Sequence, residues 1–329
     1  MSARERIACL GAGRMGRGIT VVFAYAGHEV AVVDCKPRPQ ADFDRLAADV
    51  LDDVSSTLAS LARLGLFEEV HVAAIARRVT VVAEERAGAA LSSAAVIFEA
   101  VPEVLNLKRD VLARSSTLAG PKPIVASTTS TMLADDLACA VAHPRRFLNA
   151  HWLNPAYLVP LVELSPCAAT DAATLARMQS LLDAIGKVPV VCAPRPGYIV
   201  PRIQALAMNE AARMVEEGVA SAADIDKAIR YGFGFRFAVL GMLEFIDWGG
   251  GDILYYASKY LTQALGNGRY AAPDIIERNM REGRIGLSSR KGFLDYENLD
   301  VEAYRAERLK SFVAMLGLLG LSRPPVLPE

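Results

Sequence analysis

The chain has 329 residues, of which 52% are hydrophobic, with 36 basic and 37 acidic side chains. A chain of this length can bury a large core, and we expect it to divide into two domains. Its net charge of -1 gives no electrostatic reason to expect nucleic acid or an anionic membrane as a partner.

The cysteines and the apolar runs exclude further classes of protein. Five cysteines occur, none in a Cys-x-x-Cys pair, so neither a disulfide framework nor a cysteine metal site is indicated. No uncharged stretch reaches the roughly 20 residues of a membrane-spanning helix, and no charged, apolar, small-residue leader precedes Ile7. We therefore expect a soluble, cytoplasmic protein without a bound metal.

The chain opens with the order strand, glycine loop, helix, strand. The apolar residues predict a strand over Arg6–Leu10, a helix over Arg14–Ala26 and a second strand over Glu29–Asp34. The loop after the first strand reads Gly11-Ala-Gly-Arg-Met-Gly16. A loop of this composition between a strand and a helix is typical of a dinucleotide-binding turn.

Each glycine of this loop has its own purpose in such a turn. Gly11 allows the tight turn, Gly13 lets the backbone approach a pyrophosphate, and Gly16 lets the helix pack on the strand. The unpaired N–H groups at the N-terminus of the helix would bind the anion. Together with Met15, these glycines form the predicted cofactor loop.

Asp34 ends the second strand, about 20 residues past the loop. An acid at this place would bond the ribose 2′-hydroxyl and repel a 2′-phosphate, which favours NAD over NADP. The alternative is that Asp34 is an ordinary turn residue at a strand end. Lys36 and Arg38 are close enough in sequence to soften the repulsion.

Strands and helices alternate over the remainder of the first domain. The further strands predicted are 79–82, 96–98, 124–126, 147–150, 161–164 and 188–192, and the helices are 42–64, 108–118, 133–142 and 171–185. This alternation predicts the α/β fold class, as a Rossmann-type doubly wound sheet with helices on both faces.

The cluster Pro194-Arg-Pro-Gly197 is the predicted domain boundary. Beyond it the pattern is helical: a helix over 199–217 ends at Gly218, and Ser221 with Asp224 resembles a capping box. We therefore expect a cofactor-binding domain over residues 1–194, which also carries the catalytic residues. An all-α C-terminal domain over residues 195–329 would form the substrate cleft and a dimer contact.

The segment His151-Trp-Leu-Asn-Pro155 supplies the candidate for proton transfer. Oxidation of an alcohol needs a base for the hydroxyl proton, and histidine is suited because its ordinary pKa lies near working pH. Glu163 is the nearest downstream acid, and Pro155 and Pro160 allow the chain to loop back so that the two meet. A carboxylate on the second ring nitrogen would fix the tautomer. The alternative is a histidine that only caps a strand end.

These motifs together resemble the 3-hydroxyacyl-CoA dehydrogenase family across nearly the whole chain. The motifs that carry the resemblance are the Gly11 loop, Phe98-Glu-Ala-Val-Pro-Glu103, Ala126-Ser-Thr-Thr-Ser130, His151-x-x-Asn-Pro155, Leu161-Val-Glu163 and Arg290-Lys-Gly-Phe-Leu-Asp-Tyr296. The resemblance implies His151 as catalytic base or acid with Glu163 as its orienting partner, Ser127 and Asn154 beside the reacting oxygen or the imidazole, and Glu103 and Lys108 beside the nicotinamide ribose. It also implies NAD as cofactor, a homodimer and a place in fatty acid metabolism.

Two departures from the family pattern concern the substrate. The family usually carries an asparagine where Pro201 follows Pro196-Gly-Tyr-Ile-Val200, and proline has no side-chain amide. Pro201 also suits the first turn of a helix. The stretch Gly232-Phe-Gly-Phe-Arg236 resembles the lambda-crystallin and gulonate 3-dehydrogenase branch, whose members can act on free hydroxy acids. Arg236 would suit a free carboxylate, or it would pair with a structural acid such as Glu244 or Asp247.

The leading hypothesis is an NAD-dependent dehydrogenase of short-chain 3-hydroxyacyl-CoA, such as 3-hydroxybutyryl-CoA, that forms the 3-oxo product. The alternative is a dehydrogenase of a free hydroxy acid. A third hypothesis, supported only by Pro201, is a protein that binds NAD without catalysis.

Overall fold

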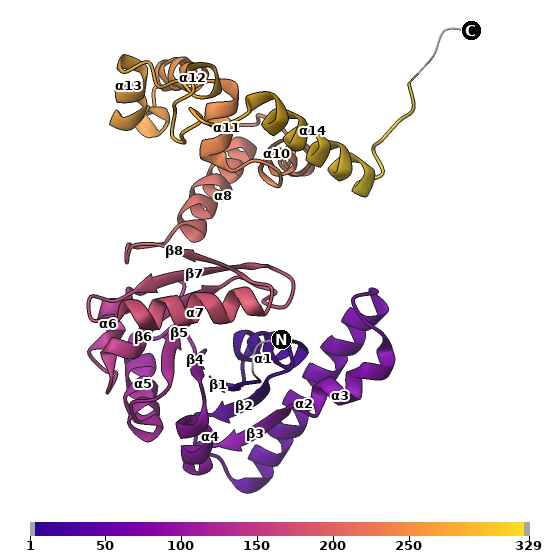
Figure 1. Cartoon of the computed structure of the whole chain (residues 1–329), viewed down its shortest axis with the longest axis vertical. Coiled ribbons are helices and arrows are strands. Elements are labelled where there is room, and N and C mark those ends of the chain that lie inside the picture. The colour runs from indigo at the N-terminus through magenta and orange to yellow at the C-terminus, as the bar shows by residue number, and fades with distance from the viewer. Residues whose placement is uncertain (1–3, 326–329) are drawn as a thin grey trace. The chain divides into compact units, whose positions relative to one another are not determined.

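The computed structural model describes residues 4–325 and divides the chain into two compact units (Figure 1). The first unit ends at Ala207 and the second begins at Met208, so that the division falls inside helix α8 (Val200–Glu216). The boundary at 194/195 that the proline-glycine cluster indicates lies shortly before this helix and stays a prediction. Within 4–325, no helix has both the length and the apolar character needed to cross a membrane.

The first unit is built on an eight-stranded sheet of order β3-β2-β1-β4-β5-β6-β7-β8. The strands are β1 (Arg6–Leu10), β2 (Glu29–Asp34), β3 (Val79–Ala83), β4 (Val96–Glu99), β5 (Ile124–Ser127), β6 (Phe147–Trp152), β7 (Leu161–Pro166) and β8 (Val188–Val191). All neighbours are parallel except β6 and β7, which are antiparallel. This is the doubly wound α/β sheet that the alternating pattern predicts.

Helices cover both faces of this sheet. Those of the first unit are α1 (Arg14–Tyr25), α2 (Gln40–Arg63), α3 (Val72–Ala76), α4 (Gly88–Ser93), α5 (Leu105–Ala119), α6 (Ala134–Ala138) and α7 (Ala172–Ala184). The hydrophobic core on one face includes buried residues of α1, α2, α3 and α7, and the core on the other face includes residues of α4, α5 and α6. Both faces of the central strands are therefore buried, as in other parallel sheets, whereas the edge strand β8 is partly exposed.

The predicted helix over 133–142 is wrong in length, because α6 ends at Ala138. The next N–H groups turn back more tightly: that of Ala140 donates to Leu137 and that of Val141 to Ala138. Pro144 also disfavours helical backbone at the residue before it. The N–H of Ala142 donates to the Ser116 hydroxyl at 2.9 Å, so that the chain leaves the helix early without losing its hydrogen bonds.

Except for two isolated bridges near its end, the described part of the second unit is helical. Its helices after α8 are α9 (Ala222–Ala228), α10 (Gly234–Phe237), α11 (Met242–Gly249), α12 (Gly251–Ala264), α13 (Asp274–Arg281) and α14 (Val301–Leu318). Ser221 caps α9 by accepting the Asp224 N–H at 3.1 Å. Its hydroxyl donates to the Asp224 carboxylate at 2.7 Å, so that the side-chain pair replaces the second bond of a capping box.

One buried carboxylate stabilises the end of the second unit. Asp247 is 2% exposed and accepts the N–H groups of Phe293 at 2.9 Å and Leu294 at 2.8 Å, as well as the Tyr296 hydroxyl at 3.2 Å. A Cβ added at Gly292 would lie 2.1 Å from an Asp247 oxygen, so glycine is required there. The glycine-aromatic signature after Arg290 is thus a structural motif closed around Asp247.

Candidate active site

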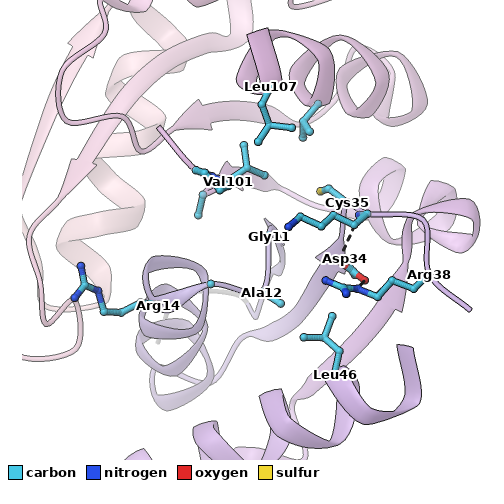
Figure 2. A pocket seen from close by; sticks show the side chains of 14 residues that line it. Gly11, Ala12, Arg14, Asp34, Cys35, Arg38, Leu46, Val101 and Leu107 are labelled. Atoms are coloured by element: carbon cyan, nitrogen blue, oxygen red, sulfur yellow. Dashed lines mark hydrogen bonds and ion pairs between the residues drawn. The ribbon is translucent and has the colours of Figure 1, made fainter. Parts of the chain in front are cut away.

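A cavity of about 400 Å³ lies beside the glycine loop, at the carboxyl ends of β1, β2 and β4. Figure 2 shows its two apolar sides, with Leu46 on one and Val101 and Leu107 on the other. Asp34 and Arg38 lie at one end, and Gly13 lies where the loop meets α1. An apolar cavity with a carboxylate at one end fits an adenosine, and the loop beside it fits a pyrophosphate.

The glycine loop has the geometry that a dinucleotide requires. Gly11 has a φ of +101°, which side chains disfavour. A Cβ on Gly16 would lie 2.1 Å from the Gly11 carbonyl oxygen, whereas a Cβ on Gly13 would meet nothing within 4 Å. Helix α1 begins after Gly13 without a side-chain cap, so its first N–H groups are available to an anion. Met15 is half-buried and packs on the hydrophobic core; it is not a lining residue of the cavity.

Asp34 is buried and already paired. Its carboxylate accepts the Arg38 guanidinium at 2.6 Å and the Lys36 N–H at 3.4 Å. Burial raises the pKa of the neighbouring Cys35 thiol to about 12, with a further contribution from the charge of Glu84. The thiol therefore contributes a neutral surface to the cavity.

A buried ion pair joins β4 and α5. Lys108 is 1% exposed and donates to Glu99 at 2.9 Å and to the Val101 carbonyl at 3.1 Å; its ammonium also lies 3.3 Å from Glu103. Glu99 is fully buried and also accepts the Ser127 hydroxyl at 2.6 Å and the Val101 N–H at 2.9 Å. Lys108 and Glu103 are not among the lining residues of the cavity. Lys108 is held by protein groups, and a contact of either residue to the nicotinamide ribose stays a prediction.

Glu103 holds the loop that follows β5. It accepts the hydroxyl groups of Thr129 and Thr131 and the N–H groups of Ser130 and Thr131, the latter two at 3.0 and 3.2 Å. Burial alone would raise the pKa of the Glu103 carboxyl, but the Thr129 hydroxyl and the charge of Lys108 lower it below its usual value. The carboxylate therefore stays ionised to lower pH than an ordinary glutamate does.

Strand pairing brings the polar side chains of the site to one face of the sheet. In register across β4, β5, β6 and β7 lie Glu99, Ser127, Asn149 and Ser165, all fully buried. Paired residues of neighbouring strands point to the same face, and so do residues two apart on one strand. His151 and Glu163 are therefore the next polar pair on this face, toward the carboxyl end of β6.

His151 and Glu163 are direct partners across the antiparallel ladder. His151 Nδ1 lies 2.7 Å from Glu163 Oε2, and both side chains are at least 94% buried. Glu163 Oε1 accepts the N–H groups of Ile199 at 3.0 Å and Val200 at 2.8 Å, at the start of α8. Pro201 is the second residue of α8, which agrees with its role as a helix starter.

Asn154 lies in the loop 153–160 between β6 and β7, and its predicted place beside the reacting oxygen or the imidazole stays a prediction. With Pro155 it lines a second cavity of about 570 Å³, which the glycine loop separates from the first. Lys187 holds the loop, because its ammonium donates to the carbonyl oxygens of Ala156 at 2.6 Å and Val159 at 2.8 Å. Burial lowers the pKa of this lysine.

Arg236 does not pair with either acid that the sequence suggests. Glu244 accepts Arg308 at 2.8 Å, and Asp247 is enclosed by its own backbone donors. Arg236 is exposed, lies over the Phe245 ring at 5.4 Å and has no ion pair within the described residues. It follows a π-helical turn over Ile229–Phe233, a rare conformation that is frequent at functional sites.

Sequence reasoning missed Glu99, Thr129 and Asn149. Glu99 offered a signal, because a charged residue that ends a fully apolar strand at the carboxyl edge of the sheet needs a partner. Asn149 donates to the Thr129 carbonyl at 3.1 Å, a contact that only the pairing of β5 with β6 creates. In residues 4–325, no cluster of three or more histidine, cysteine or acidic side chains could hold a metal ion.

Comparison with known proteins agrees with this geometry. The family model described as the 3-hydroxyacyl-CoA dehydrogenase NAD binding domain matches residues 6–195, and the model of the C-terminal domain of the same family matches residues 197–296. A solved 3-hydroxyacyl-CoA dehydrogenase from Archaeoglobus fulgidus superposes with a TM-score of 0.74 at 30% identity, covering 97% of this chain and all of the other.

Three relatives show the breadth of the group. The 5-formyl-3-hydroxy-2-methylpyridine 4-carboxylate 5-dehydrogenase of Mesorhizobium japonicum is 31% identical over 96% of this chain and 98% of its own. Lambda-crystallin of Oryctolagus cuniculus is 32% identical over 76% of both chains, and L-carnitine dehydrogenase of Streptomyces coelicolor is 35% identical over 82% of both. The chain belongs to the 3-hydroxyacyl-CoA dehydrogenase family, whose members are NAD-dependent dehydrogenases acting on hydroxyl groups.

Proposed function

We propose that His151 is the general base of an NAD-dependent dehydrogenase that oxidises a secondary hydroxyl group to an oxo group. The observation that carries this proposal is the buried pair of His151 and Glu163 at 2.7 Å, on the strand edge that also bears the dinucleotide loop. NAD, held by Gly11, Gly13 and Asp34, would accept the hydride when bound.

The hydrogen bond between Glu163 and His151 determines which ring nitrogen of His151 accepts the hydroxyl proton. Because Glu163 faces Nδ1 of His151, that nitrogen carries the hydrogen, and Nε2 remains free to take the hydroxyl proton. The two N–H donors from Ile199 and Val200 hold the carboxylate in place. Glu163 can then stabilise the imidazolium that forms.

The bond of Ser127 limits what this hydroxyl can do. Its single hydrogen is donated to Glu99 at 2.6 Å, so toward a substrate its oxygen can only accept. The substrate hydroxyl gives its one hydrogen to His151, so the proposal lets Ser127 bond the substrate oxygen only when the Ser127 hydrogen turns from Glu99 toward that oxygen.

Replacement of the pair tests the chemical assignment. His151→Gln and Glu163→Gln should each lower kcat by about 100- to 10,000-fold, the range for loss of a general base or its orienting partner. NAD binding, measured by calorimetry, should persist. The matched control is His143→Gln, since the His143 side chain is exposed and the hydrogen bond of this residue, from the Arg146 N–H, goes to its backbone carbonyl oxygen. Retention of full turnover by His151→Gln would refute the proposal.

For the substrate, we propose a free 3-hydroxy acid in preference to a coenzyme A thioester. An exposed guanidinium without an acidic partner is available to bind a carboxylate through two hydrogen bonds, and Arg236 meets this description. Two relatives act on compounds whose names specify no thioester, a pyridine carboxylate and L-carnitine. The thioester remains the second candidate, supported by the solved 3-hydroxyacyl-CoA dehydrogenase.

A substrate panel separates the two candidates. Wild-type protein should turn over free 3-hydroxy acids with a higher kcat/KM than 3-hydroxybutyryl-CoA. Arg236→Met should raise KM for the acids by about tenfold or more while leaving thioester turnover unchanged. Arg230→Met, on the π-helical turn that precedes Arg236, is the matched control. Turnover of the thioester alone would reverse the assignment.

We propose a homodimer that uses the second unit. Its buried apolar side chains are Ile225, Leu240, Ile276, Leu287 and Tyr296. Helix α14 has no buried residue. Apolar side chains such as Tyr260 (69% exposed) and Leu318 (80% exposed) instead lie at the surface of this unit. Such surface usually marks an interface, most often with a second copy of the chain. Light scattering at micromolar concentration should give twice the chain mass; a monomer would contradict the proposal.

A further inference from the structure

We propose that Tyr198 is a positioning residue for the proton-transfer step, because its ring stacks on His151 and its hydroxyl is tied to the loop that Glu103 holds. This proposal deepens the proposed function and rests on His151 as the base.

The ring of Tyr198 lies against the imidazole. The centroids of Tyr198 and His151 are 5.7 Å apart and their planes are inclined by 28°, an offset stacked arrangement. Tyr198 is 5% exposed, so the contact is shielded from water. Glu163 fixes His151 in the plane of its ring, through Nδ1. Tyr198 restrains the ring in the perpendicular direction, which Glu163 cannot do.

The phenol of Tyr198 is held at its far end. Its hydroxyl donates to the Met132 carbonyl, at the end of the loop after β5. Thr129 and Thr131 in the same loop donate to Glu103. Burial raises the pKa of the Tyr198 phenol, as does the charge of Glu103, so the hydroxyl keeps its proton at any pH at which the enzyme works.

The backbone conformation of Tyr198 is a second indication that its contact with His151 has a function. Its φ is 44°, in the left-handed region that side chains larger than glycine or asparagine seldom adopt. The next two residues, Ile199 and Val200, donate their N–H groups to Glu163. A single turn of chain therefore contacts both members of the proton-transfer pair, with its ring on the histidine and its backbone on the carboxylate.

The stacked ring also has an electrostatic effect. The face of an aromatic ring carries partial negative charge and attracts a cation. Tyr198 should thus favour the imidazolium that His151 becomes after it accepts the proton. A general base acts in its unprotonated form, so loss of a ring that favours the imidazolium should move the rise of kcat/KM with pH, in the oxidation direction, to lower pH.

Two variants separate the ring from the hydroxyl. Tyr198→Phe keeps the stack and loses the bond to Met132; kcat should fall about threefold, with the pH profile in place. Tyr198→Leu loses both; kcat should fall about tenfold, and the rise of kcat/KM should move by roughly half a pH unit to lower pH. KM for NAD should stay within about twofold in both variants, because the ring is not on the cofactor cavity. Tyr25→Leu, whose ring contacts Phe67, is the matched control.

An observation that does not need turnover completes the test. Titration of the His151 ring protons by NMR, assigned with His151→Gln, should show proton uptake at lower pH in Tyr198→Leu than in wild type or Tyr198→Phe. If Tyr198→Leu does not fold, Tyr198→Met takes its place. The proposal is overturned if the titration and the pH profile do not move, or if neither variant folds, since the residue would then be purely structural. If His151 is not the base, a different result shows it: turnover by His151→Gln stays unchanged.

Discussion

Replacement of Lys108 by methionine should destabilise the first unit strongly. Lys108 and Glu99 are 1% and 0% exposed, and their charged groups lie 2.9 Å apart. Methionine fills a similar volume but leaves Glu99 in the core without its cation, with only the Val101 N–H and the Ser127 hydroxyl as donors. Breaking a buried pair from one side costs about 3–5 kcal/mol. We expect the free energy of unfolding to fall by about that amount.

The double variant tests whether the charge is the cause. Glu99→Gln removes the orphaned carboxylate, so Lys108→Met in that background should cost about 2 kcal/mol less than in the wild type. Urea unfolding followed by circular dichroism measures all four proteins. Lys227→Met is the control, because Lys227 pairs with Asp224 at 3.1 Å with a side chain that is 69% exposed, and its loss should cost less than about 0.5 kcal/mol. A cost below about 1 kcal/mol for Lys108→Met, or strict additivity, would refute the reasoning.

Three further outcomes are expected. Gly16→Ala should weaken NAD binding about tenfold or more by calorimetry, because its Cβ would lie 2.1 Å from the Gly11 oxygen; unchanged affinity would mean that the loop relaxes freely. The pKa of Glu103 is lowered in the folded state, so this carboxylate stabilises the fold above its ordinary value of 4.5 and ceases to do so as pH falls through the lowered value. Glu103→Gln should therefore destabilise the protein in urea at neutral pH and progressively less as the pH falls below 4.5, and a loss that does not change with pH would contradict this. Asp247→Asn should lower thermal stability by about 2 kcal/mol, since one amide cannot accept from two N–H groups and a phenol as a carboxylate does; a melting temperature equal to wild type would exclude this role.

The sequence was sufficient for features that depend on local pattern. The strands over Arg6–Leu10 and Glu29–Asp34 are confirmed residue for residue, because a buried parallel strand needs a continuous apolar run and the glycine loop marks where the first one ends. The contact of His151 with Glu163 also followed from a local cue, two prolines in a short connection between strand candidates.

Features that depend on strand order could not be predicted in this way. Glu99, Ser127 and Asn149 are far apart in sequence and meet only because β4, β5 and β6 are neighbours in register. Tyr198 reads as an aromatic next to a glycine, and nothing local indicates that its ring faces His151. The partner of Arg236 was equally undetermined, since Glu244 and Asp247 are both engaged by residues more than 40 positions away.

Because β6 and β7 are antiparallel, the pairing of these two strands places the proton-transfer residues, and the loop 153–160 that joins the strands is not needed for this. The antiparallel ladder alone sets His151 opposite Glu163. Lys187 holds the connection 153–160 by hydrogen bonds to backbone carbonyl oxygens, which a residue of any type supplies. The exposed side chains of this connection, such as Asn154 and Leu158, can therefore be exchanged while the strand register and the Lys187 bonds persist, whereas Ala156 is buried in the core. Asn154 and Pro155 in this connection line a cavity. Substitutions at these positions would change the lining of the cavity while the His151–Glu163 pair stays in place, which is a route by which related enzymes could differ in substrate.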